Sequence, residues 1–240
     1  MVRQPATLLT ALAALAAFDL LAPHLADHPS TAVAVAGLAL VSIPLATLVP
    51  RALAAETGRG LLLLAAAVPA VAATVALIWA GYGGTAATLT KLLAASLIGL
   101  ALGSLLQSPL EIVGIAVLIA AVDTYSVARG PTRVIVEHHQ DVLNDFTLAF
   151  HPLGSQGAAQ IGASDFVFFA VFLAAAARFG LRTRLTWIAM TASFGLTLFL
   201  SYWFDRALPA LPLLSLAFLA ANAVPLRERI GGSFTSPERD

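Results

Sequence analysis

Long apolar runs, separated by short polar, glycine or proline breaks, are the feature that most constrains this chain. A helix needs about 20 mostly apolar residues to cross the hydrocarbon core of a bilayer. Hydrophobic residues make up 59% of the sequence and charged residues 11%, and the mean hydropathy is +0.89. A soluble domain carries roughly 25% charged residues. We therefore expect an all-α fold, a polytopic bundle of transmembrane helices, in an integral, multi-pass membrane protein whose surroundings are the lipid bilayer.

The breaks between the runs divide the chain into eight expected spans. The run 86–128 is too long for one span, and Gln107-Ser108-Pro109 is its natural break. For the N-terminal run we favour a retained helix over a cleaved signal peptide, because the run is long and contains Asp19. The expected spans are 6–23, 31–49, 60–80, 86–106, 109–128, 161–178, 184–204 and 207–225.

Three regions follow from this division. Residues 1–106 form N-terminal helices that we expect to act as a scaffold, and residues 107–225 form the helices expected to carry the chemistry. The longest polar segment, 129–160, lies within the second region; its first part favours a short interfacial helix and its end indicates a flexible loop. We expect the remaining residues, 226–240, to form a polar, disordered tail. We find no internal repeat and no soluble domain.

The distribution of basic residues predicts the orientation. Eight spans place both termini on one side of the membrane, and an excess of Lys and Arg marks the cytoplasmic side. One side has eight such residues: Arg3, Arg51, Arg59, Arg178, Arg182, Arg184, Arg227 and Arg229. The other side has Arg129, Arg133 and Arg206, with Lys91 just inside a helix end. We therefore expect cytoplasmic termini and a 129–160 loop that faces outward.

Several kinds of chemistry are disfavoured by composition. The chain has no cysteine, which excludes disulfides, thiolate ligands and a cysteine nucleophile, and its net charge of zero gives no indication of nucleic-acid binding. Gly81-Tyr82-Gly83-Gly84 lacks a following Lys-Ser/Thr signature and indicates a tight loop rather than a phosphate cradle. Polar residues of the 129–160 loop favour a solvated face over a metal site; they are His138, His139, Asp141 and Asp145.

Four acidic residues fall within or beside the apolar runs. Glu111 lies at a helix end, where an interfacial position accounts for it. Asp19 lies about four residues from its helix end, and either reaches the interface or pairs with Lys91 on the same face. Asp123 and Asp165 lie deeper and need another explanation.

Asp123 lies about six residues before the end of its helix, which corresponds to a depth of roughly 9 Å. Asp165 follows the intervening loop and enters the next, antiparallel helix to a similar depth from the same face. A charge in the bilayer interior costs at least ~2.5 kcal/mol, so such residues usually face a cavity and mark function. Two neighbouring carboxylates do not both ionise comfortably and tend to share one proton. Such a pair suits water activation, but separate interhelical hydrogen bonds and a proton or cation relay also remain open.

The residues around both aspartates resemble the presenilin and signal peptide peptidase family, the GxGD intramembrane aspartyl proteases. The segment Val122 to Val127 and the following Arg129 to Glu137 resemble the family's YD helix. The segment Ile161 to Phe169 is similar to its GxGD helix, and Leu208 to Pro212 matches its PAL motif. These segments occur in the family's order and cover about half of the chain, residues 110–225.

The resemblance implies a presenilin-like fold and an intramembrane aspartic endopeptidase, as in a prokaryotic plasma-membrane member of the family. Asp123 and Asp165 would be the catalytic dyad that holds the hydrolytic water. Five residues would help to position the substrate: Gly162, Ser164, Pro209, Ala210 and Leu211. Substrates would be transmembrane-helix peptides or remnant signal peptides, with no metal and no organic cofactor.

The chain departs from the family pattern at three points. Val122 stands where the family usually has tyrosine, Ser164 stands in place of the second glycine of GxGD, and we count eight spans where the family typically has nine. Ser164 keeps open a catalytically inactive scaffold with the protease fold. A proton-coupled transporter that uses the two aspartates as a relay is the alternative from another functional class.

Overall fold

The computed structural model describes residues 3–25, 30–129, 145–154, 157–206 and 208–235, with only the backbone described in 3–5 and 231–235. Almost all of the described chain is helical. The long helices are α1 (Arg3–Leu21), α3 (Ile43–Leu53), α4 (Gly60–Trp79), α5 (Gly84–Leu105), α6 (Pro109–Arg129), α9 (Ala163–Arg178), α10 (Thr183–Trp203) and α11 (Leu211–Thr235). The short elements are the helix α2 (Thr31–Gly37), the helical turns η1 (Ala22–His24), η2 (Leu38–Ser42) and η3 (Ala54–Glu56), and the strands β1 (Thr147–Phe150) and β2 (Ala159–Gly162).

Six helical segments of the described chain are long and apolar enough to cross a membrane. They are Ala6–His24, Thr31–Glu56, Gly60–Trp79, Gly84–Leu105, Pro109–Arg129 and Thr183–Trp203. This composition indicates an integral membrane protein with an all-α polytopic bundle. The segments expected at 161–178 and 207–225 are also helical, as α9 and α11, but they are not among these six.

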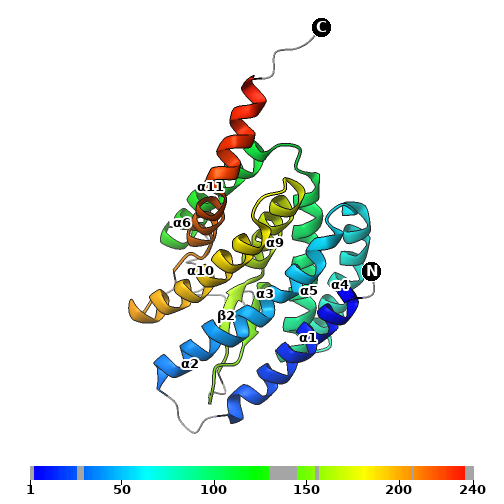
Figure 1. Ribbon diagram of the computed structural model, residues 1–240. Helices are drawn as coiled ribbons and strands as arrows, with labels where there is room; N and C mark the ends of the chain where they lie inside the picture. The colour runs from blue at the N-terminus through cyan, green and yellow to red at the C-terminus, as the bar shows by residue number, and fades with distance from the viewer. Residues whose placement is uncertain (1–2, 26–29, 130–144, 155–156, 207, 236–240) are drawn as a thin grey trace.

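Helix α9 lies at the centre of the bundle, between α10 on one side and α5 on the other (Figure 1). Its side chains are nearly all inaccessible to solvent, from Phe166 to Ala176. The contact with α5 is close because Gly99 and Gly103 face it: a Cβ at Gly99 would lie 2.2 Å from the carbonyl oxygen of Val167. Small residues four apart allow transmembrane helices to approach in this way. Helices α6 and α11 pack together on one flank, and α4 packs against α5 on the other.

Proline and capping residues explain several helix boundaries. The span Thr31–Glu56 contains the π-helical turn η2 just before Pro44, which has no N–H with which to continue the α-helical ladder. Helix α6 begins with a reciprocal cap, in which Ser108 accepts from the Glu111 amide while the Glu111 carboxylate accepts from Gln107 N and the Ser108 hydroxyl. Glu111 therefore caps the start of α6.

Two helices begin later than expected. The helix expected to begin at residue 161 begins at Ala163, because the preceding residues form β2 and pair with β1. The helix expected from residue 207 begins at Leu211, so Pro209 and Ala210 lie in the link that precedes it.

The region 226–240, expected to be a disordered tail, is helical as far as Thr235, because α11 continues through Pro225. Two contacts hold this extension: Leu226 is buried, and Arg229 donates to the carbonyl oxygen of Gly180 at 3.1 Å. The interfacial helix expected in 132–143 lies outside the described residues.

The β-hairpin is the one feature of another class in the described chain, and an all-α expectation misses it. The strands are antiparallel, with Thr147 opposite Gly162 and Phe150 opposite Ala159. The end of the 129–160 loop, expected to be flexible, therefore contributes its last two residues to β2. The expected tight loop at Gly81 to Gly84 is present, with φ +72° at Gly81 and +71° at Gly84.

Candidate active site

A cavity of about 420 Å³ lies where α6, α9, α10, the hairpin and the link before α11 meet. Both Asp123 and Asp165 line this cavity. Pro209 and Ala210 of the PAL segment line it as well, although they are far from both aspartates in sequence. The tertiary structure thus brings three separate sequence segments to one place.

Asp123 is half-buried near the end of α6, and its carboxylate contacts the start of α11. Its Oδ2 accepts a hydrogen bond from the backbone N–H of Leu211 at 3.1 Å. Leu211 is the first residue of α11, so its N–H has no partner within the helix. The partial positive charge of the helix N-terminus favours the carboxylate there. The PAL segment is consequently held against Asp123 by a direct contact.

Asp165 is the third residue of α9 and turns back toward the residue that precedes the helix. Its carboxyl is hydrogen-bonded to the backbone of Gly162, the N-cap residue, and is close enough to Asp123 for the two charges to interact. Such a bond from the third position to the N-cap is half of a capping box. Each of the two carboxyls therefore lies at a helix N-terminus, and the two face the same cavity.

Gly162 leaves room for the Asp165 carboxyl. A Cβ at this position would lie 3.3 Å from Asp165 Oδ2 and 3.2 Å from Ser164 Oγ, both tighter than an ordinary contact. In the structure, the atoms nearest to it belong to its own helix, and the close interhelical approach is made by Gly99 and Gly103 of α5.

Ser164 is solvent-exposed and lines the cavity beside Asp165. Its hydroxyl therefore lies beside the carboxyl at the position where the resembled family has glycine.

Residues that the sequence reasoning missed complete the wall. Thr147 and Gln160 come from the hairpin, and Thr197 and Ser201 come from α10. A signal for the α10 pair exists in the sequence, because Ser193, Thr197 and Ser201 recur every four residues in the second half of the helix, which is otherwise mostly apolar. The hairpin residues carry no such signal, because their position depends on a strand pairing that the sequence pattern does not predict.

The remaining candidates lie elsewhere. Asp19 is buried and bonded to Thr85 and His151, instead of the Lys91 or interface position considered for it. Lys91 donates to the carbonyl oxygen of Thr147 at 3.0 Å. Among the described residues, no group of three His, Cys, Asp or Glu side chains is arranged to hold a metal ion. Of the polar loop residues weighed as ligands, Asp145 is described, and the other three lie outside the described residues.

Comparison with known proteins gives one partial similarity. No protein-family model matches the chain. A 61-residue stretch is 43% identical to a presenilin-like protein from Arabidopsis thaliana. The match covers 25% of this chain and 15% of the length of that relative. Over this stretch the similarity suggests the presenilin-like family at most, and the activity has to be inferred from the site.

Proposed function

We propose that this protein is an intramembrane aspartic endopeptidase with Asp123 and Asp165 as its dyad. The observation that carries the proposal is the single cavity onto which both carboxyls and the PAL segment open. Its wall also contains apolar side chains, among them Phe194 and Leu198, which suit a peptide segment taken from a bilayer. The partial similarity to a presenilin-like protein is consistent with this activity.

The proposed chemistry requires the two carboxyls to share one proton. The ionised carboxylate takes a proton from a water molecule, whose oxygen attacks the carbonyl carbon of the scissile bond. The protonated carboxyl gives its proton to the carbonyl oxygen, and a tetrahedral diol forms. When the C–N bond breaks, the carboxyl that took the water's proton delivers a proton to the leaving nitrogen, and a diol hydroxyl returns a proton to the other. One water is consumed, and the pair again holds one proton.

The hairpin suggests how an unwound substrate would be held. A transmembrane helix has its carbonyls hydrogen-bonded internally, so the scissile segment must first become extended. An extended segment can add to a sheet edge through main-chain hydrogen bonds. The outward-facing backbone groups of β1 are bonded to Thr88 and Lys91, and the next residue, His151, is bonded to Asp19, so an added strand would pair with β2. Strand β2 runs directly into Gly162 and Asp165, which would place the segment beside the dyad.

Replacement of each aspartate tests the proposal. Asp123→Asn and Asp165→Asn should each reduce cleavage of a panel of transmembrane peptides by at least about 10²-fold, because each removes one half of the acid–base pair. Asp205→Asn is the matched control, since Asp205 is exposed outside the cavity and has φ +48°, which asparagine also tolerates. An aspartyl-protease transition-state isostere should block the wild-type protein.

Three outcomes would contradict the proposal. Cleavage that survives both aspartate substitutions would exclude the dyad. Proton-coupled flux in proteoliposomes without any proteolysis would favour a transporter, and an absence of both activities would favour an inactive scaffold.

A further inference from the structure

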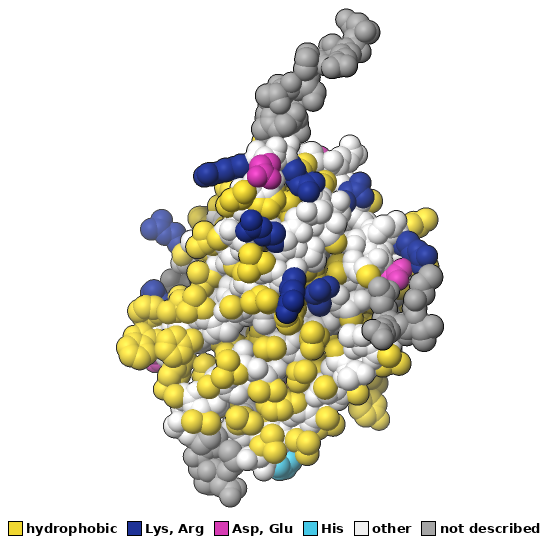
Figure 2. All heavy atoms as spheres, in the orientation of Figure 1, with side chains coloured by type: hydrophobic (Ala, Val, Ile, Leu, Met, Phe, Trp, Pro, Cys, Tyr) yellow, Lys and Arg dark blue, Asp and Glu magenta, His cyan; other side chains and the backbone are white. Residues whose placement is uncertain are grey.

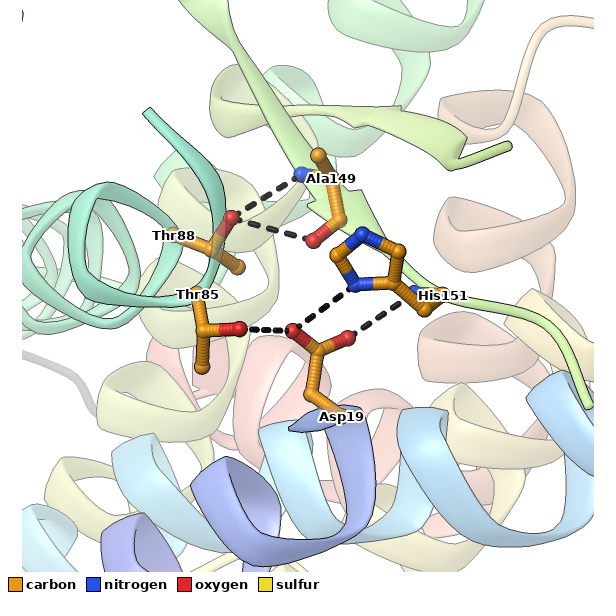
Figure 3. Close-up of polar contacts among 5 residues, drawn as sticks. All are labelled: Asp19, Thr85, Thr88, Ala149 and His151. Carbon is orange, nitrogen blue, oxygen red and sulfur yellow. Dashed lines mark hydrogen bonds and ion pairs between the residues drawn. The ribbon is translucent and has the colours of Figure 1, made fainter. Parts of the chain in front are cut away.

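A polar cluster on the far side of the hairpin anchors β1 to the N-terminal helices (Figure 3). At its centre is Asp19, near the end of α1, which is only 2% exposed. Its Oδ1 accepts from the backbone N–H of His151 at 2.8 Å, and its Oδ2 accepts from the Thr85 hydroxyl and lies 3.1 Å from Nδ1 of the His151 ring. Burying a carboxylate without hydrogen-bond partners costs free energy. The partners that Asp19 has here therefore favour this one position of His151 and β1 over positions in which those bonds are broken.

Helix α5 adds two more contacts to the same strand. The hydroxyl of Thr88 donates to the carbonyl oxygen of Ala149 at 3.0 Å and accepts from its N–H at 3.2 Å. Lys91 bonds to the Thr147 carbonyl oxygen. The N–H and the carbonyl oxygen of Ala149 both face α5. In this antiparallel pair the residues that make main-chain hydrogen bonds to β2 are therefore its neighbours, Leu148 and Phe150. Side chains of α5 therefore hold the outer edge of β1, and Asp19 of α1 holds His151, the residue that follows the strand.

The position of β1 affects the proposed dyad through the pairing of β1 with β2. Thr147 is opposite Gly162, and Gly162 is both the last residue of β2 and the N-cap residue to which the Asp165 carboxyl is bonded. Thr147 and Gly162 also line the cavity that contains both aspartates. A shift of β1 would consequently move the cavity wall and the backbone that orients Asp165.

From this chain of contacts we propose that Asp19 is a positioning residue for the proposed hydrolysis, acting through His151 and β1. The proposal rests on the proposed proteolytic function. Asp19 touches neither the cavity nor the dyad; it sets the position of the hairpin against which the substrate and Asp165 are aligned. Asparagine at this position would keep one acceptor oxygen but would direct an amide donor at the Thr85 hydroxyl or at the His151 ring.

The experiment compares Asp19→Asn with the control Asp205→Asn, using transmembrane peptides and titration of competent sites with the transition-state isostere. We expect kcat per titrated site to fall about tenfold in Asp19→Asn, because a small shift of the hairpin would misplace Asp165 and the substrate relative to each other. We also expect the cleavage positions to spread over neighbouring peptide bonds, measured by mass spectrometry. A purely structural role would lower the number of titrated sites and leave both quantities unchanged.

A second pair of variants keeps the proposal testable if Asp19→Asn does not fold. Thr88→Val removes the side-chain bonds to Ala149, whereas Thr90→Val removes only bonds to the carbonyl oxygens of its own helix, Ala86 and Ala87. Thr88→Val should spread the cleavage positions, and Thr90→Val should not. Hydrogen exchange of the amides in 147–150 and 159–162 should be faster in Asp19→Asn and Thr88→Val than in their controls.

The outcomes separate the two proposals. If the wild-type protein cleaves, but Asp19→Asn and Thr88→Val match their controls per titrated site and in cleavage position, the positioning role is wrong and the dyad stands. If the wild-type protein cleaves no peptide, the proteolytic function fails, and the positioning role fails with it.

Discussion

At the scale of single residues, backbone atoms orient the two aspartates of the candidate site. The Asp123 carboxylate is bonded to the amide of Leu211, and the Asp165 carboxyl is bonded to the backbone of Gly162. Both aspartates are thus oriented by helix N-termini rather than by other side chains. Changes in the backbone at these two points should therefore affect activity more than stability.

The substitution Gly162→Ala tests this dependence. The new Cβ would lie 3.3 Å from Asp165 Oδ2, so the carboxyl must move by a few tenths of an ångström. We expect kcat to fall by about tenfold or more, because small misplacements of catalytic groups are costly. The thermal midpoint should change little, since the crowded atoms are the ends of side chains at a cavity. Gly58→Ala is the control, because a Cβ there meets nothing within 4 Å. Equal kcat in the two variants would show that Gly162 does not orient Asp165.

At the scale of elements, the contact between α5 and α9 holds the centre of the bundle. Lipid tails are as apolar as the helix surfaces, so close packing rather than burial from water drives helix association in the bilayer. Helix α5 supplies Gly99 and Gly103 for this contact, and the same helix supplies Thr88 and Lys91 to β1. Helix α5 therefore connects the packing of α9 with the position of the hairpin.

Gly99→Ala should destabilise this contact. Its Cβ would lie 2.2 Å from the carbonyl oxygen of Val167 and 2.7 Å from Cβ of Ala170, so the helices must separate. Overpacking of this kind typically costs about 1–3 kcal/mol of folding stability. Thermal unfolding in detergent micelles should show a clear decrease in the midpoint. Gly114→Ala in α6 is the matched control, because a Cβ there has open space around it and should leave the midpoint unchanged or slightly raised. Equal midpoints for the two variants would contradict the packing role of Gly99.

At the scale of the whole molecule, the charges indicate how the bundle is oriented. Lys and Arg side chains gather on the upper part of the face in Figure 2, and the lower part is covered mostly by apolar side chains. The end of α9 with Arg178 contacts η3, and Arg229 contacts Gly180, so several basic segments meet at one end of the bundle. The hairpin and the dyad cavity lie toward the other end, where α9 begins. We propose that the basic end and both termini are cytoplasmic, and that the membrane is a prokaryotic plasma membrane.

Single-cysteine labelling tests this orientation, since the natural chain contains no cysteine. Gly58→Cys lies in the turn beside the basic residue Arg59, and Gly83→Cys lies in the turn between α4 and α5 at the opposite end. Both positions are exposed and have nothing within 4 Å of an added Cβ. A membrane-impermeant maleimide should label Gly83→Cys in intact cells and Gly58→Cys only after permeabilisation. The reverse pattern would invert the proposed topology.

The sequence by itself determined the helical segments and the residues worth testing. Apolar runs of fixed length specify helices in a bilayer, because each backbone group must be satisfied within the segment. A charged group in such a run costs free energy, and this cost identified Asp123 and Asp165 as candidate functional residues without any knowledge of the fold. The i, i+4 spacing of Gly99 and Gly103 was equally visible in the sequence, but their partner was not, since many helices could have occupied that face.

Only the tertiary structure decided which separate segments meet. The β1–β2 register, the bond from Asp123 to Leu211 and the cluster around Asp19 all join residues distant in sequence. Local patterns do not encode such pairings, because each depends on the positions of several helices at once. Asp19 illustrates the difference: its side chain was close enough to the helix end for the interface or Lys91, and the fold placed His151 and Thr85 against it instead.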